Sequence, residues 1–142
     1  MHVNIFYNYS AFHTPPPKKL IKLTEYVLRK EDRKPGQINI IFTDNKEIFS
    51  LNVQYLDHYY NTDVIAFYYS KSGPVEGDIF ISLDKVDENS KEYQTGFEDE
   101  LIRVIIHGVL HLVGYTDKTE DEKEYMHHLE DRYMNHYNLE LR

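Results

Sequence analysis

Two kinds of hydrophobic pattern alternate along this chain, and each predicts its own kind of secondary structure. Short segments rich in apolar and β-branched residues, bounded by turn residues, predict four strands at 2–8, 37–43, 63–69 and 76–83. Longer amphipathic segments predict four helices, each after a residue that can cap it: Thr14, Asp44, Thr95 and Thr119. Pro15 can open the first helix. The third helix should run from about Phe97 to Val113 and end at Gly114.

The order of these elements limits the folds that the chain can adopt. Strands that are separated by a helix can lie parallel to one another, whereas two strands joined by the turn-rich segment 70–75 form an antiparallel hairpin. We therefore predict an α/β (α+β) fold in which a mixed sheet of about four strands is covered by helices. No repeat or long linker divides the 142 residues, so we expect a single domain over 1–142.

The composition excludes several classes of site. The chain contains no cysteine, so a metal ion would need histidine, carboxylate or backbone ligands. Neither a GxxxxGK[ST] nor a GxGxxG motif occurs, so nucleotide cradling has no support. We find neither the pattern of a secretory leader nor an uninterrupted apolar run of ~18 residues. We therefore expect a cytoplasmic protein without a membrane partner.

The charge of the chain is distributed unevenly. Its net charge of −8 argues against a protein that coats nucleic acid, but residues 18–34 contain seven basic and three acidic side chains. On a helix, four of these basic residues fall within an arc of about 60°: Lys18, Lys22, Arg29 and Arg33. This basic stripe is compatible with a solvated face, or with a surface for RNA or an acidic partner.

The segment RVIIHGVLHLVGYTDK, residues 103–118, carries a pattern that is typical of a metal site. His107 and His111 are four residues apart on the predicted helix, so both imidazoles can reach one ion. Gly114 can adopt the left-handed conformation that turns the chain back, which brings Asp117 toward the same point. Two imidazoles and one carboxylate leave a fourth tetrahedral position open to water, as in catalytic zinc sites.

Other interpretations of these histidines stay open. A histidine pair at this spacing is also found as incidental or hydrogen-bonded core residues, and it is the helix end with Asp117 that favours a metal. The zinc-protease signature needs a glutamate directly after the first histidine, where this chain has Gly108. Two histidines and a carboxylate also suit non-haem iron. The remaining histidines are interpreted as surface or packing residues: His2, His13, His58, His127, His128 and His136.

The stretch HGVLHLVGY, residues 107–115, resembles the signature HGxLHLxGYDH of the YbeY family of bacterial endoribonucleases. Other segments are similar in the same order, namely LNVQY to LNxxYR, TDVIAF to TDVLSF, GDIFIS to GDIxIS, and GFEDEL to the segment before the histidine helix. The similarity covers nearly the whole chain. It implies a zinc site at His107, His111 and the third signature position, and action on the RNA of the small ribosomal subunit. It also implies contact with ribosomal proteins or an assembly GTPase.

Three departures from the family pattern change the chemistry of the predicted site. Asp117 stands where the signature has its third histidine, which lowers the charge of the site by one. Bound water is then less acidified, and either slower hydrolysis or a preference for another divalent metal would follow. Leu56 replaces an arginine, and if that arginine binds phosphate, a bidentate donor is lost. Ala66 replaces a serine and removes one hydroxyl.

Two charged residues on the histidine helix can take part in the site. Arg103, one turn before His107, can supply the cation that Leu56 lacks, or it can form a salt bridge with Asp99 or Glu100. Glu100 can be an acceptor behind the metal ligands or a distant base. We expect Glu100 instead to be a solvent-exposed acid that the helix dipole favours.

These patterns lead to one hypothesis and two alternatives. We predict a metal-dependent endoribonuclease of ribosomal RNA maturation and small-subunit quality control, with its metal site on the C-terminal helical side of the fold. One zinc ion or another divalent ion would be held by His107, His111 and Asp117, with Arg103 as a further catalytic residue and the basic stripe guiding RNA. The alternatives are a non-catalytic ribosome-assembly factor with a structural metal, and a zinc hydrolase of another ester or amide.

Overall fold

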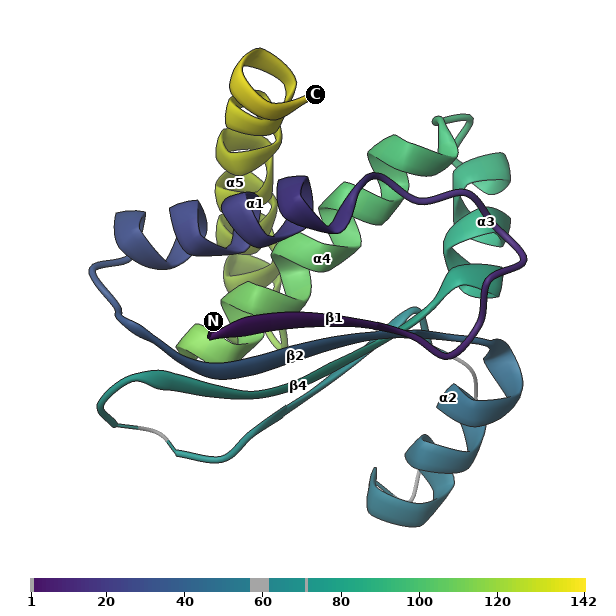
Figure 1. Ribbon diagram of the computed structural model, residues 1–142, viewed down its shortest axis with the longest axis horizontal. Helices are drawn as coiled ribbons and strands as arrows, with labels where there is room; N and C mark the ends of the chain where they lie inside the picture. The colour runs from purple at the N-terminus through teal and green to yellow at the C-terminus, as the bar shows by residue number, and fades with distance from the viewer. Residues whose placement is uncertain (1, 57–61, 71) are drawn as a thin grey trace.

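The computed structural model describes residues 2–56, 62–70 and 72–142, in which the first three strands alternate with helices and the fourth strand is followed by three α-helices (Figure 1). The strands are β1 Val3–Tyr7, β2 Pro35–Thr43, β3 Val64–Tyr68 and β4 Val75–Ser82. The α-helices are α1 Pro17–Lys30, α2 Asn45–Leu51, α3 Leu83–Glu92, α4 Phe97–Val113 and α5 Glu120–His136. Two π-helical turns extend α2 and α5, at Asn52–Leu56 and Tyr137–Leu141.

The four strands form one mixed sheet in the order β1-β2-β4-β3. β1, β2 and β4 are parallel neighbours, while β3 pairs with β4 in the antiparallel orientation. The crossover through α1 keeps β1 and β2 parallel, and the short connection between β3 and β4 closes a hairpin. The predicted mixed sheet of about four strands, covered by helices, is confirmed.

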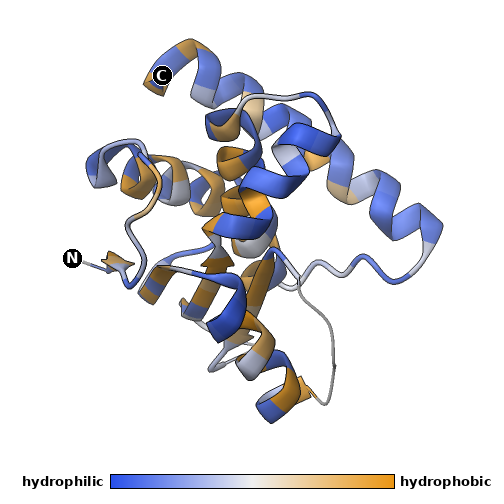
Figure 2. Cartoon of the chain, turned by 90° about the vertical axis from the view of Figure 1, so that its right-hand side faces the viewer, coloured by the Kyte–Doolittle hydropathy of each residue, from blue (hydrophilic) through white to orange (hydrophobic). Residues whose placement is uncertain are grey.

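The core lies between the sheet and the helices that cross one of its faces. α1 and α4 lie on that face, and α5 packs against α4 (Figure 1). The apolar side of α1 is buried as predicted, with Leu20, Leu23, Val27 and Leu28 at 0% exposure. Figure 2 shows hydrophobic residues gathered on the strands and inner helices, while α5 is mostly hydrophilic. Within the described residues, no helix is both long enough and apolar enough to cross a membrane.

Gly108 marks a close approach between α4 and the sheet. A Cβ atom at this position would lie 2.7 Å from Cγ2 of Ile79 on β4 and 3.2 Å from Cγ2 of Val64 on β3. The helix can pack at this depth only because residue 108 has no side chain. His107 and His111, on either side of Gly108 in the sequence, project beside this contact and stay partly exposed.

Two of the four predicted helix caps are present. At the start of α2, the Asp44 carboxylate accepts a hydrogen bond of 2.9 Å from the backbone N–H of Glu47. At the start of α5, Thr119 and Glu122 form a capping box in which each side chain accepts a hydrogen bond from the backbone N–H of the other. These contacts satisfy amide groups that the first turn of a helix leaves unpaired.

The structure corrects the other two cap predictions. α1 begins at Pro17 with Pro16 at the cap position, so the roles predicted for Thr14 and Pro15 are wrong. α4 begins after Gly96 without a side-chain cap, so the role predicted for Thr95 is also wrong.

A further helix, α3, was not predicted. Ser82 caps it by accepting a hydrogen bond of 3.1 Å from the backbone N–H of Lys85. Only two apolar side chains of this helix are buried, Leu83 and Val86, and its remaining buried positions are the polar residues Asn89 and Ser90. The predicted strand 76–83 includes Leu83, so Val86 is left as the one buried apolar residue of α3 that can indicate a helix.

Candidate metal centre

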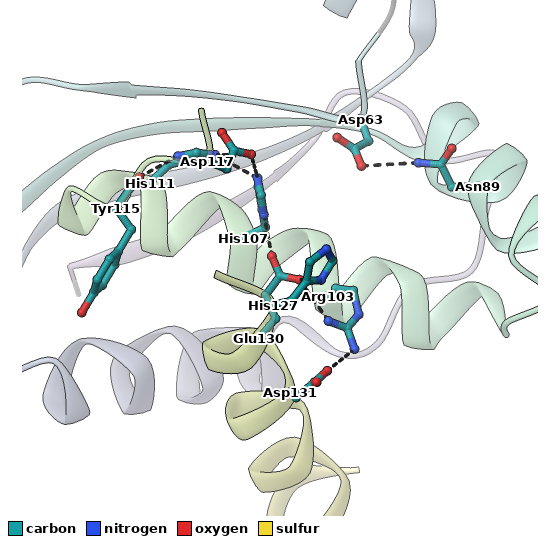
Figure 3. A network of polar contacts seen from close by, with 10 residues as sticks. All are labelled: Asp63, Asn89, Arg103, His107, His111, Tyr115, Asp117, His127, Glu130 and Asp131. Atoms are coloured by element: carbon teal, nitrogen blue, oxygen red, sulfur yellow. Dashed lines mark hydrogen bonds and ion pairs between the residues drawn. The ribbon is translucent and has the colours of Figure 1, made fainter. Parts of the chain in front are cut away.

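The side chains of His107, His111 and Asp117 converge beside α4 (Figure 3). The Nε2 atoms of the two imidazoles are 2.9 Å apart. Oδ2 of Asp117 lies 3.3 Å from Nε2 of His107 and 3.7 Å from Nε2 of His111. One potential ligand atom of each side chain thus lies within 4.8 Å of the others, and no second group of this kind occurs in the part of the chain that the structure describes.

Asp117 reaches this point through the turn between α4 and α5. α4 ends at Gly114, whose φ of 123° lies where glycine is favoured over other residues. Glu122 of α5 then holds the turn, because its carboxylate accepts hydrogen bonds from the Thr116 hydroxyl (2.7 Å) and the backbone N–H of Lys118 (3.0 Å). These bonds lower the pKa of Glu122, chiefly through Thr116.

Each imidazole is oriented by a contact at its other nitrogen. Nδ1 of His107 lies 2.5 Å from Oε2 of Glu130, and Nδ1 of His111 lies 2.9 Å from the backbone oxygen of Tyr115. A carbonyl oxygen only accepts hydrogen bonds, so Nδ1 of His111 must carry the proton. With Nδ1 used in this way on both rings, the Nε2 atoms point toward Asp117. Two imidazole nitrogens and a carboxylate oxygen fit zinc and several other divalent ions.

The two histidines differ in their electrostatic surroundings. Burial alone lowers the pKa of His107, but the hydrogen bond and charge of Glu130 outweigh it, and the net pKa is raised. The pKa of His111 is lowered by burial and by the neighbouring His107. The two Nε2 atoms lie 2.9 Å apart and face the same point. A metal ion bound there would require both nitrogens to be unprotonated.

Arg103 forms ion pairs, although not with the predicted partners. Its Nη1 donates to Oε1 of Glu130 at 3.0 Å and its Nη2 donates to Oδ1 of Asp131 at 2.7 Å. The alternative of a salt bridge to Asp99 or Glu100 on the same helix is wrong, because α5 supplies acidic partners from across the interface. Burial would lower the pKa of Arg103, but the bonds to Asp131 and then Glu130 raise it overall.

A cavity of about 530 Å³ opens on the His107 side of the site. Arg103, Asp117 and two acidic residues, Asp63 and Glu100, are among the residues that line it. Burial raises the pKa of the Asp63 and Glu100 carboxyl groups, and the charge of Asp63 raises the pKa of Glu100 further. Glu100 has only 8% of its surface exposed, so the prediction that it is solvent-exposed is wrong.

A second cavity, of about 540 Å³, opens on the His111 side. Leu56 and Ala66, which replace the family's arginine and serine, both line it, together with Val64, Tyr68 and other residues. The substitutions of arginine by leucine and of serine by alanine therefore make the same cavity less polar. The three converging side chains lie between the two cavities, since His107 and Asp117 line one and His111 lines the other.

The basic stripe is shorter than the sequence pattern indicates. Lys18, Lys22 and Arg29 are exposed on α1, but α1 ends at Lys30. Arg33 therefore lies beyond the helix, and its guanidinium donates hydrogen bonds to the backbone oxygens of Val113 (3.0 Å) and Gly73 (3.1 Å). The position predicted for Arg33 on the helix is wrong.

Two of the histidines that the sequence indicates as surface or packing residues have described contacts. His136 stacks on Tyr26 with ring centroids 3.4 Å apart, and His127 lies 3.4 Å from Oε1 of Glu130. His58 lies outside the described residues.

The most important residue that sequence reasoning missed is Glu130. The buried side of α5 is formed by Met126, Leu129 and Tyr133, and Glu130 lies among them with 2% of its surface exposed. A charged residue on the buried stripe of a helix needs a polar partner. The place of Glu130 on this apolar stripe indicates a buried, paired carboxylate. The sequence does not reveal that its partners are His107 and Arg103.

The mixed sheet and the three converging side chains define a small α/β protein built around a candidate divalent-metal site. Residues 9–138 match the sequence model of the family described as endoribonuclease YbeY. The chain belongs to this family, which confirms the resemblance inferred from its motifs.

Individual relatives agree with this assignment. The endoribonuclease YbeY of Karelsulcia muelleri is 41% identical over 132 residues, which cover 93% of each chain. That of Flavobacterium johnsoniae is 40% identical over 114 residues, 80% of this chain and 82% of the relative. The solution structure of a Thermotoga maritima protein superposes with a TM-score of 0.67 at 28% identity, and the match covers 94% of this chain and 87% of that one.

Proposed function

We propose that this protein is a metal-dependent endoribonuclease that hydrolyses phosphodiester bonds of ribosomal RNA during maturation and quality control of the small subunit. The observation that carries the proposal is the convergence of His107, His111 and Asp117 between two cavities. Relatives that are about 40% identical over most of the chain are named endoribonucleases, which supports the same activity.

The ligands of the proposed metal ion are Nε2 of His107, Nε2 of His111 and the Asp117 carboxylate. Zinc is the proposed ion, because it accepts nitrogen and oxygen donors in a tetrahedral site, although another divalent metal suits the carboxylate as well. Such an ion, when bound, polarises a phosphoryl oxygen or supplies a hydroxide nucleophile at neutral pH.

The residues around the site orient the ligands and the RNA. Glu130 and the Tyr115 carbonyl fix the two imidazoles. Arg103 lines the cavity beside His107, and its two ion pairs use only some of its five N–H donors. We assign the remaining donors to a phosphate oxygen of the substrate. A strand that passes the ligands can place its flanking nucleotides in the cavities on either side.

The basic stripe is the proposed guide for RNA outside the site. Lys18, Lys22 and Arg29 are exposed on α1, where they can neutralise phosphates without reading sequence. Arg33, which lies beyond the end of α1, is a further proposed phosphate contact. We place the protein in the cytoplasm with the maturing small subunit, in contact with ribosomal proteins and an assembly GTPase.

The experiment that tests this function measures cleavage of small-subunit ribosomal RNA by purified protein. We expect cleavage by zinc-loaded protein that stops on chelation and is lost in His111→Ala. Elemental analysis of wild type and His107→Ala should show metal only in the wild type. Equal metal content in both would remove the basis of the mechanism.

The second candidate function is a non-catalytic assembly factor, which Leu56 and Ala66 favour, because they stand in the cavity beside His111 where the family pattern has an arginine and a serine. Metal-loaded protein that binds small-subunit particles but leaves RNA intact at high protein concentration would establish this function instead. Turnover of another ester or amide in a panel of small substrates would point to the hydrolase alternative.

A further inference from the structure

We propose that Glu130 is a positioning residue of the metal centre: it sets the orientation of His107 without binding the ion itself. The inference rests on the proposed function, because it assumes that His107 is a metal ligand. It starts from three contacts of one buried carboxylate. Oε2 lies 2.5 Å from Nδ1 of His107, and Oε1 lies 3.0 Å from Nη1 of Arg103 and 3.4 Å from Nδ1 of His127.

The contact with His107 leaves one ring nitrogen for a metal. An imidazole held at Nδ1 by an acceptor presents the lone pair of Nε2 to the opposite side, where Asp117 and His111 lie. His111 receives the same constraint from the backbone oxygen of Tyr115, which a side-chain substitution does not remove. Of the two orienting groups, Glu130 is therefore the one that can be tested by a point variant.

Glu130 does not belong to the ligand group itself. It touches the Nδ1 edge of His107, whereas the ligand atoms of the candidate site gather at the Nε2 edge. Its second oxygen is bound by Arg103, which also compensates the cost of burying a carboxylate. The chain of contacts runs from Arg103 on α4 to Glu130 on α5 and back to His107 on α4 (Figure 3).

A different role for Glu130 would be to anchor α5 on α4 through Arg103 alone. The neighbouring residue allows the two roles to be separated. Asp131 accepts a hydrogen bond of 2.7 Å from the same guanidinium, and its described contacts do not include His107. Asp131→Asn therefore weakens the anchor and spares the imidazole. Arg103→Gln breaks the ion pair with Glu130 and likewise leaves the contact with His107.

The test measures the affinity of metal-free protein for Zn²⁺ by competition with a chromophoric chelator. We expect Glu130→Gln to weaken zinc binding by ~10- to 100-fold, the usual effect of removing a carboxylate behind a histidine ligand. Asp131→Asn should weaken it by less than about fivefold, since exposed ion pairs contribute little. Arg103→Gln should weaken it less than Glu130→Gln does, since the Glu130 carboxylate keeps its contact with His107. Thermal unfolding of each metal-free variant shows whether the fold is retained.

If folded Glu130→Gln binds zinc as tightly as wild type does, the proposal is overturned. If Arg103→Gln loses as much zinc affinity as Glu130→Gln, the effect belongs to the anchoring of α5 on α4, and the proposal is overturned as well. If Glu130→Gln does not fold, NMR of wild-type protein decides. In the zinc-loaded wild type, we expect a Nδ1 proton on His107 that is protected from solvent exchange. Its absence, or exchange as fast as at an exposed histidine, overturns the proposal. Equal zinc binding by wild type and His107→Ala would instead refute the metal site, and this inference with it.

Discussion

The hydroxyl of Tyr115 donates a hydrogen bond of 2.5 Å to Glu31, which links the turn after α4 to the end of α1. Tyr133 of α5 donates to the other oxygen of the same carboxylate. The bond to Glu31 raises the pKa of Tyr115, and burial followed by the same carboxylate raises that of Tyr133. The backbone carbonyl of Tyr115 orients His111. The Glu31 carboxylate at the end of α1 therefore stabilises part of the candidate site.

Tyr115→Phe should lower the free energy of unfolding by about 1–3 kcal/mol, because a hydrogen bond to a charged acceptor is lost. Urea unfolding of the metal-free protein measures this change. Tyr93→Phe, at an exposed tyrosine, is the control for loss of a hydroxyl and should have little effect. A double variant with Tyr133→Phe should differ from the sum of the two single changes, because both tyrosines share Glu31. Full additivity would contradict the shared acceptor.

Gly108→Ala should destabilise the protein even though alanine is the better helix former. The new methyl group would meet Ile79 at 2.7 Å and Val64 at 3.2 Å, and such overpacking costs about 1–3 kcal/mol. The gain in helix propensity, about 1 kcal/mol, offsets only part of this cost. Thermal unfolding measures the net change. A more stable variant would show that α4 can move away from the sheet at no cost.

Glu100→Gln should stabilise the metal-free protein at neutral pH. Burial, and then the charge of Asp63, raise the pKa of Glu100 above its unfolded value, so the folded state carries a buried charge at neutral pH. As the pH falls through the raised pKa, wild type takes up a proton and its stability rises relative to the glutamine variant. The difference in unfolding midpoint should therefore shrink on acidification. A difference that grows as the pH falls would contradict the raised pKa.

Leu56→Arg should increase RNA cleavage, because it restores a bidentate phosphate donor at the cavity beside His111. Cleavage rates at several salt concentrations measure the effect, which should be largest at low salt. Leu56→Gln is the control for polarity without charge and should leave the rate near that of wild type. Equal rates in all three proteins would show that a cation at this position does not contact the substrate.

The sequence predicted the features that depend on local structure. The four strands follow from short apolar runs, and the capping box at Thr119 follows from a four-residue pattern. The closeness of His107 and His111 is a property of any α-helix with histidines at this spacing. The reversal at Gly114 needed one further local rule, that glycine readily takes a positive φ.

The errors arose where local patterns compete with their surroundings. The spacing of the basic residues continues to Arg33, but Asp32 takes a φ of 56° and the helix ends before it. The sequence pattern predicts caps at Thr14 and Thr95, whereas Pro16 and Gly96 occupy the cap positions. The sequence offers Arg103 acidic partners on its own helix, yet α5 places two carboxylates within its reach.

The four strands, four of the five described α-helices, the mixed sheet and the three side chains that can hold a metal could be predicted from the sequence, because each depends on residues close together in the chain or on a family likeness. The tertiary structure alone decided what surrounds those side chains: Glu130 behind His107, Glu31 behind Tyr115, and the cavities on either side. These contacts join residues 23 and 84 positions apart. They depend on how α5 and α1 pack against α4, and no periodicity in the sequence records such packing.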